Sequence, residues 1–380
     1  MLHFISPYSA PQGTTLSCAS ENQMKQRTSN VFYANVAWNV FFGVLTILMT
    51  YWVIRNKLRK HRSVFTKSAN ILLQWIMVKG MFHAVIYGAI QLSSLAKSLL
   101  NSHDPCSIMF DEFECWPLYT LDILARLMIS FDYNLLTIDG ALSSFFVGWK
   151  PSKSRANILH AVSIVCAVVT CLIMTSDGPT TNILANCLAR QGRDLGELTR
   201  QLLVYGGSYT LCFALTTITW IGDYCKSKKG ATNIHQIFEN EMRHRASRFL
   251  FFATLIEMVV MSAYPAGVII LIKTLSLWDP VEVGNYVLWT YQFNVSTCIL
   301  PGLIWMFVND TIRKRREHKE RVMSENKVTT TQAAQDDYFT KLASDWDDKL
   351  KMKEAKAAQH ALQSGGRHSR VAPEKTTVEA

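Results

Sequence analysis

The sequence predicts an all-α protein: a bundle of seven transmembrane helices with its N-terminus outside and a C-terminal tail inside. Three observations lead to this prediction. The 380 residues are 49% hydrophobic, and apolar runs are long enough to cross the ~30 Å hydrocarbon core of a bilayer. Basic residues follow alternate runs, and one run carries four ionisable side chains. The predicted helices are residues 31–54, 68–92, 115–148, 158–175, 201–224, 249–272 and 286–308.

The third helix is the one around which we expect the others to pack. It contains Asp122, Arg126, Asp132 and Asp139, and a charge at the bilayer centre costs at least ~2.5–3.5 kcal/mol unless it faces a bundle interior. Asp122 and Arg126 stand four residues apart, which places them on one face of a helix and allows them to pair. A purely structural ion pair explains these two as well as a functional role does. Lys79, near mid-depth on the second helix, is a candidate partner for Asp132.

The distribution of Lys and Arg predicts the orientation. The loops after the first, third and fifth helices hold about twice as many as the opposite side, and the richer side is cytoplasmic. Residues 1–30 are then an extracellular segment, 31–308 the transmembrane domain, and 309–380 a cytoplasmic, largely disordered tail. The net charge of +10 therefore indicates membrane flanks and no nucleic-acid partner.

Nothing in the sequence predicts a cofactor, a metal site or catalysis. The nine cysteines are scattered, without the spacing of a metal-binding motif. A membrane metalloenzyme would need several ligands at one depth, and only His83 and His160 lie near the helices. The intramembrane charges leave a plasma-membrane transporter or channel as the alternative function, although no inverted repeat is visible.

Three segments resemble the nematode serpentine chemoreceptors of the class alpha and alpha/beta superfamily, which are similar to G-protein-coupled receptors. They are DPCSIMFDEFECWPL (104–118), IDGALSSFF (138–146) and NIHQIFENEMRHRASRFLFF (233–252). The resemblance covers about residues 31–320. It implies a multi-pass plasma-membrane receptor of sensory neurons that binds an external small molecule and signals through a heterotrimeric G protein.

The resemblance also implies a disulfide from the outer end of the third helix to the second outer loop. Cys187 lies in that loop. Cys115 precedes Gly140 by the spacing that separates the bridging cysteine from the helix-three arginine in rhodopsin-like receptors. We therefore expect Cys115, and not Cys106, to be the partner of Cys187.

A ligand site is expected below this bridge. Asp122 lies about 10 Å deeper than Cys115 at 1.5 Å per residue, at the depth of the carboxylate that binds protonated amines in aminergic receptors. If Arg126 neutralises it, a polar or anionic ligand is equally compatible. The predicted ligand-binding residues, between helices three, six and seven, are Tyr119, Asp122, Arg126, Tyr291 and Asn294.

The G-protein face is expected at the inner loops and the basic start of the tail, and Gly140 is its main departure from the family pattern. Gly140 stands where these receptors have the arginine of an Asp-Arg or Glu-Arg pair, so we expect weak or atypical coupling. Helices six and seven keep prolines but lack the tryptophan and the Asn-Pro-x-x-Tyr partners of rhodopsin-like receptors. The predicted residues of the face are Asp139, Gly140, Arg243, Arg245 and Arg248.

Overall fold

The structure is a computed structural model and divides into two compact units, Met1–Thr311 and Ile312–Ala380. It describes residues 18–61, 64–146, 149, 152–176, 183–184, 187, 195–228, 234–274, 277–290, 293–328, 340–341, 344, 348, 351–352 and 355. The helical bundle belongs to the first unit.

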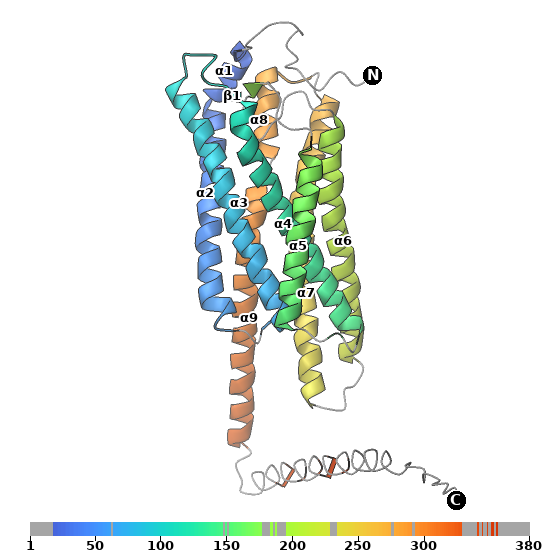
Figure 1. Cartoon of the computed structure of the whole chain (residues 1–380). Helices are drawn as coiled ribbons and strands as arrows, with labels where there is room; N and C mark the ends of the chain where they lie inside the picture. The colour runs from blue at the N-terminus through green and yellow to red at the C-terminus, as the bar shows by residue number, and fades with distance from the viewer. Residues whose placement is uncertain are drawn as a thin grey trace, which may run out of the picture. The chain divides into compact units, whose positions relative to one another are not determined.

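The described chain is almost entirely helical, as the sequence predicts (Figure 1). Each of the first six predicted helices corresponds to one of α2 to α7, and the seventh corresponds to α8 and α9 together. The elements are α1 (Glu21–Arg27), α2 (Asn30–Val53) with a π-helical turn (Ile54–Leu58), α3 (Lys67–Leu100), β1 (Phe110–Asp111), α4 (Glu112–Phe145), α5 (Lys153–Met174), β2 (Ile183–Leu184), α6 (Leu195–Lys228), α7 (Ile234–Thr274), α8 (Pro280–Thr290) and α9 (Phe293–Val328).

Besides α1, which is capped by Ser20, four of the helices begin at a side chain that satisfies a free backbone N–H of the first turn, the usual role of Ser, Thr and Asp before a helix. This explains why α2, α3, α4 and α5 start where they do. The pairs, acceptor first, are Ser29 and Phe32, Thr66 and Ala69, Asp111 and Phe113, and Ser152 and Arg155.

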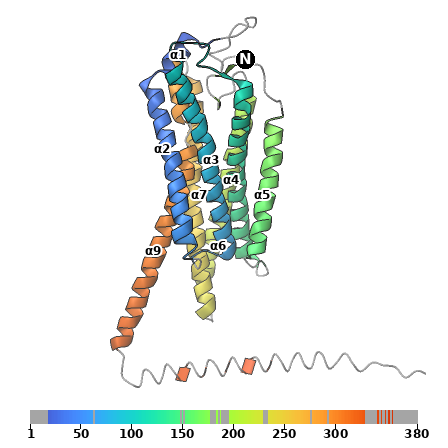
Figure 2. The same ribbon diagram turned by 60° about the vertical axis from the view of Figure 1, so that its left-hand side comes forward.

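The central position predicted for the third helix is confirmed. α4 contacts α3, α5, α6 and α7, and the two ribbon views show it between α3 and α5 (Figure 2). Asp122, Asp132 and Asp139 are 0%, 0% and 3% exposed. The charged side chains of α4 therefore point into the bundle, as their cost in lipid requires.

The outer faces of the bundle are apolar. On α5, Leu172 and Ile173 are each 64% exposed, and on α2, Phe41 and Leu48 are 59% and 60% exposed. Four described helices are long and apolar enough to cross a membrane: Asn30–Leu58, Lys67–Leu100, Lys153–Met174 and Val281–Glu317.

Several predicted helix ends are wrong: α3 runs to Leu100 and not to residue 92, α9 runs to Val328 and not to residue 308, and α7 begins well before residue 249. The sequence placed Arg243, Arg245 and Arg248 in a loop before a helix at residue 249, but α7 begins at Ile234 and carries all three. The helix continues because this segment is rich in Gln, Glu, Met and Arg, which are good helix formers. Apolarity alone marks only the part of a helix that lies in lipid.

Candidate functional site

Two disulfides lie at one end of the bundle, here called the disulfide end. Cys115 is bonded to Cys187 with Cα atoms 4.9 Å apart, and Cys18 to Cys106 with Cα atoms 4.2 Å apart. The first bridge is the pairing expected from the resemblance. Next to it β1 and β2 pair antiparallel, with Phe110 opposite Leu184. The chain after α5 is therefore fixed to the start of α4 by both a covalent bond and a strand pair.

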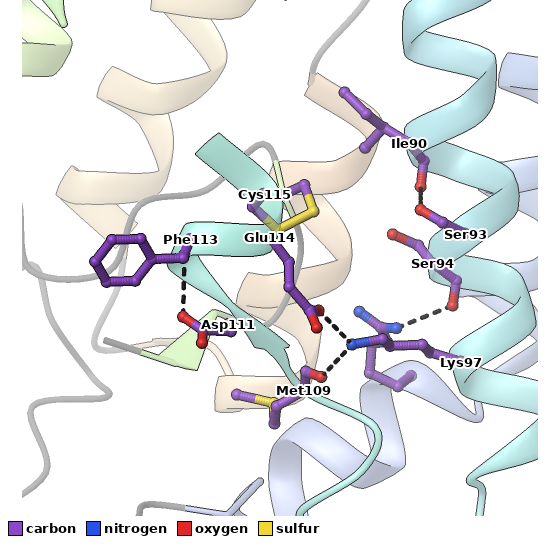
Figure 3. Close-up of a disulfide and its surroundings, with 11 residues drawn as sticks. Ile90, Ser93, Ser94, Lys97, Met109, Asp111, Phe113, Glu114 and Cys115 are labelled. Atoms are coloured by element: carbon purple, nitrogen blue, oxygen red, sulfur yellow. Dashed lines mark hydrogen bonds and ion pairs between the residues drawn. A yellow bond between two sulfur atoms is a disulfide. The ribbon is translucent and has the colours of Figure 1, made fainter. Parts of the chain in front are cut away.

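The first turn of α4 is also held to α3 (Figure 3). Lys97 Nζ donates to the backbone oxygen of Met109 at 2.9 Å and lies 3.2 Å from Glu114 Oε2. The ammonium of Lys97 lies 4.1 Å from the centre of the Phe110 ring. Cys115 therefore stands on a helix start that is fixed on two sides.

Arg27 attaches α1 to the same end. Its Nε donates to Ser98 Oγ and its Nη2 to the backbone oxygen of Ser94, both at 2.9 Å. The guanidinium carbon lies 5.2 Å and 5.5 Å from the ring centres of Phe32 and Phe110. Burial lowers the pKa of Arg27 to about 10, so the side chain stays charged at neutral pH. The N-terminal helix is thus part of the disulfide end.

A small hollow lies under the tethered strand. About 160 Å³ of space free of protein atoms lies between its lining side chains, and this space is open to solvent on one side. Its walls are mostly apolar and aromatic, and Glu112 is the charged side chain among them. The lining residues are Glu112, Cys115, Trp116, Tyr119, Leu184 and Cys187.

Deeper in the bundle, Asp122 has two basic partners. Arg126 Nη2 lies 2.7 Å from Asp122 Oδ2, and His83 Nε2 lies 3.2 Å from Asp122 Oδ1. Arg126 also lies 5.6 Å from the centre of the Tyr205 ring, and Tyr205 packs in the same buried cluster as Tyr119. A continuous path of side chains therefore connects the hollow, through Tyr119 and Tyr205, to this ion pair.

A second buried ion pair lies further along α4. Lys79 Nζ is 2.6 Å from Asp132 Oδ2 and donates to Ser163 Oγ at 2.9 Å. His160 Nδ1 lies 3.5 Å from the same carboxylate oxygen, and its ring stacks on Trp75 with centres 4.1 Å apart. The interhelical pair considered from the sequence is confirmed, and it joins α3, α4 and α5.

The third aspartate of α4 lies near the end of the bundle opposite the disulfides. Asp139 accepts hydrogen bonds from Ser68 Oγ, from Trp149 Nε1 at 3.0 Å and from Arg155 Nε at 2.9 Å. The guanidinium of Arg155 lies 4.5 Å from the centre of the Trp149 ring. A cation from α5 therefore pairs with Asp139, although the next residue in the chain is Gly140.

Comparison with known sequences decides what kind of protein this is. Residues 13–346 match the family described as Serpentine type 7TM GPCR chemoreceptor Sra. The chain belongs to this family. It is therefore a multi-pass membrane protein of a chemoreceptor family, which is a family of receptors and not of enzymes.

Several of its relatives are nematode receptors. The chain is 24% identical to Serpentine receptor class alpha-10 of Caenorhabditis elegans over 340 residues, covering 87% of this chain and 97% of the relative. It is 25% identical to Serpentine receptor class alpha-32 of the same organism over 326 residues, covering 84% and 93%. The similarity extends over nearly the full length of both relatives.

The structure brings together only part of the predicted ligand-binding set of this receptor. Tyr119, Asp122 and Arg126 lie along the path from the hollow. Asn294 turns away from it, because its Nδ2 lies 3.4 Å from Asn39 Oδ1 on α2. Tyr291 lies outside the described residues. The ligand-binding role of the five residues stays a prediction.

The predicted G-protein residues gather where α4 meets α7. A Cβ atom on Gly140 would lie 4.0 Å from Leu250 Cδ1 of α7. Arg243 Nη1 donates to the backbone oxygen of Ser143 at 3.3 Å. Arg245 is half-buried, and Arg248 is exposed with its guanidinium carbon 5.7 Å from the centre of the Phe252 ring.

Sequence reasoning missed four partners of these groups. His83, Cys18, Trp149 and Arg155 were given no role at the site. Arg155 was counted only as a membrane-flanking charge, because a pairing across two helices leaves no spacing signal. The one sign in the sequence that such a partner exists is Asp139 itself, because a buried carboxylate must find a hydrogen-bond donor.

Proposed function

We propose that this receptor binds an external small molecule at the disulfide end and signals through a heterotrimeric G protein at the opposite end. The excess of Lys and Arg beside the opposite end supports this orientation, as does the persistence of disulfides in an oxidising, extracellular environment. The observation that carries the proposal is the buried Asp122–Arg126 pair, which the packed side chains of Tyr205 and Tyr119 connect to the hollow. The ligand acts by binding one packing of the bundle better than another.

The ligand we propose is polar or anionic. Asp122 is already within reach of both Arg126 and His83, so its negative charge is compensated, and a protonated amine would have to displace a cation. An anion or a neutral hydrogen-bonding group can instead exchange places with the carboxylate on Arg126. The apolar walls around Trp116 and Tyr119 suit a small apolar body on the same molecule.

The proposal is tested by a ligand screen in a heterologous cell with a G-protein signalling readout. Once an active compound is found, Asp122→Asn should lower the concentration needed for half-maximal response by about tenfold, which corresponds to ~1.4 kcal/mol, because the ligand no longer competes with a carboxylate for Arg126. Glu114→Gln is the matched control, because its exposed pair with Lys97 contributes only ~0–1 kcal/mol and leaves the response unchanged. An unchanged response of Asp122→Asn at equal surface expression would contradict the site.

The proposed orientation predicts how the disulfides respond to reduction on intact cells. Cys18 and Cys106 are exposed, whereas Cys115 and Cys187 are 1% and 3% exposed. A membrane-impermeant phosphine should therefore open the Cys18–Cys106 bridge first and Cys115–Cys187 only at higher concentration. Alkylation of the released thiols followed by mass spectrometry measures the order. Protection of both bridges until the cells are permeabilised would show that the disulfide end faces the cytoplasm.

A further inference from the structure

Glu257 joins three helices through its carboxyl group. It lies on α7 and is 1% exposed. Tyr133 of α4 donates its hydroxyl to Oε1 at 3.2 Å, and Ser296 of α9 donates its hydroxyl to Oε2. Each carboxyl oxygen therefore holds a different neighbouring helix.

Glu257 differs from the three aspartates of α4 in having no cation beside it. Asp122, Asp132 and Asp139 each pair with Arg or Lys, whereas no ion pair to Glu257 occurs among the residues that the structure describes. An isolated ionised carboxylate is too costly to bury, and such a group takes up a proton instead.

Among the residues that the structure describes, the groups that face Glu257 cannot supply a compensating charge. From α4 it meets the Tyr133 phenol and from α9 the Ser296 hydroxyl. The Tyr209 ring of α6 lies beside Tyr133, with ring centres 6.0 Å apart. Cys212 of α6 lies beside the two tyrosines. Phenols, thiols and hydroxyls are neutral near pH 7, and each hydroxyl oxygen also accepts a hydrogen bond. A protonated carboxyl therefore fits these neighbours as donor and as acceptor.

We propose that Glu257 is a proton-binding site, occupied while α7 is packed against α4 and α9 and emptied when α7 moves away from them. On separation the carboxyl meets water, its O–H bond breaks, the proton passes to water and the electron pair stays on the carboxylate. The bound proton is a property of the resting bundle alone. Its release when α7 moves rests on the proposed signalling function.

The proton links the conformation of the receptor to pH. The packed state binds one proton more than the separated state, so a rise in pH on the side to which Glu257 opens favours separation. One proton changes the ratio of the two states by at most about tenfold per pH unit. Ligand-independent nucleotide exchange on a G protein should rise with pH by up to this factor.

Infrared spectroscopy of the full-length receptor in nanodiscs tests the proton site without any signalling. At neutral pH the wild type should show the carbonyl band of a protonated carboxylic acid. Glu257→Gln should remove this band, because glutamine keeps an oxygen for Ser296 but carries no acid. Glu114→Gln, which removes an exposed carboxylate, should leave the band in place. Glu257→Asp should shift the band, and this variant replaces Glu257→Gln in the test if the glutamine variant does not fold.

Two outcomes would overturn parts of this inference separately. A spectrum unchanged by Glu257→Gln, or without a protonated-acid band in the wild type, would show that Glu257 is ionised. If instead the band disappears in Glu257→Gln while ligand-independent nucleotide exchange is independent of pH in both proteins, the result would show that Glu257 binds the proton but does not release it on signalling.

Discussion

Replacing Lys79 with methionine is expected to lower the free energy of unfolding of the receptor by about 3–5 kcal/mol, the usual cost of removing one partner of a buried ion pair. Asp132 is fully buried, and the ammonium 2.6 Å away is its closest cation. Methionine keeps the length of the side chain and removes the charge. Thermal unfolding in detergent and surface expression in cells both measure the loss.

Removing both charges should cost much less than removing one. In Lys79→Met with Asp132→Leu no ion is left in the interior, and replacing a buried pair by apolar residues is often close to neutral. The double variant should therefore unfold at a higher temperature than Lys79→Met alone. His160 lies 3.5 Å from Asp132 and provides a second check. Adding His160→Gln to Lys79→Met should lower the unfolding temperature further. Additive losses in the double variant would contradict a direct pair.

Replacing Gly140 with arginine is expected to raise signalling by about tenfold, or ~1.4 kcal/mol in the conformational equilibrium. The position has room, because a Cβ atom there meets only Leu250 Cδ1 at 4.0 Å. Asp139 already pairs with Arg155, so the new guanidinium faces α7 and adds a contact for a bound G protein. Ligand-independent nucleotide exchange, normalised to surface expression, measures the change.

The control for this variant is Gly140→Ala. Alanine fits the same space and favours the helix by about 1 kcal/mol over glycine, but it adds no charge. If the alanine variant signals as strongly as the arginine variant, the gain comes from a stiffer helix and not from the guanidinium. If neither differs from the wild type at equal expression, Gly140 does not limit coupling.

The helices themselves were readable from the sequence because burial in lipid requires long apolar runs. The same rule gave the inward face of α4, since Asp122 and Asp132 are tolerable only in a bundle interior. It failed where helices leave the membrane. α7 extends to Ile234 through residues whose helical preference is independent of burial.

The partners of the buried charges were harder to predict, because they come from other helices and the sequence gives no angle between helices. Lys79 was found as a partner of Asp132 from depth alone. Arg155 was missed as the partner of Asp139, and Cys18 as the partner of Cys106. Asn294 was predicted from its depth to border the ligand site, and in the structure its Nδ2 lies 3.4 Å from Asn39 Oδ1 of α2. Depth follows from counting residues, whereas the facing direction depends on packing.

In the function we propose, ligand binding at the disulfide end drives nucleotide exchange on a G protein. The most direct measurement uses the purified receptor in liposomes, with nucleotide exchange on a heterotrimeric G protein and ion flux recorded in the same sample. With an active compound from the screen, the receptor should accelerate exchange in the wild type, do so at lower concentrations of the compound in Asp122→Asn, and carry no flux. Flux that depends on the compound, without acceleration of exchange, would contradict the account and indicate a transporter or channel.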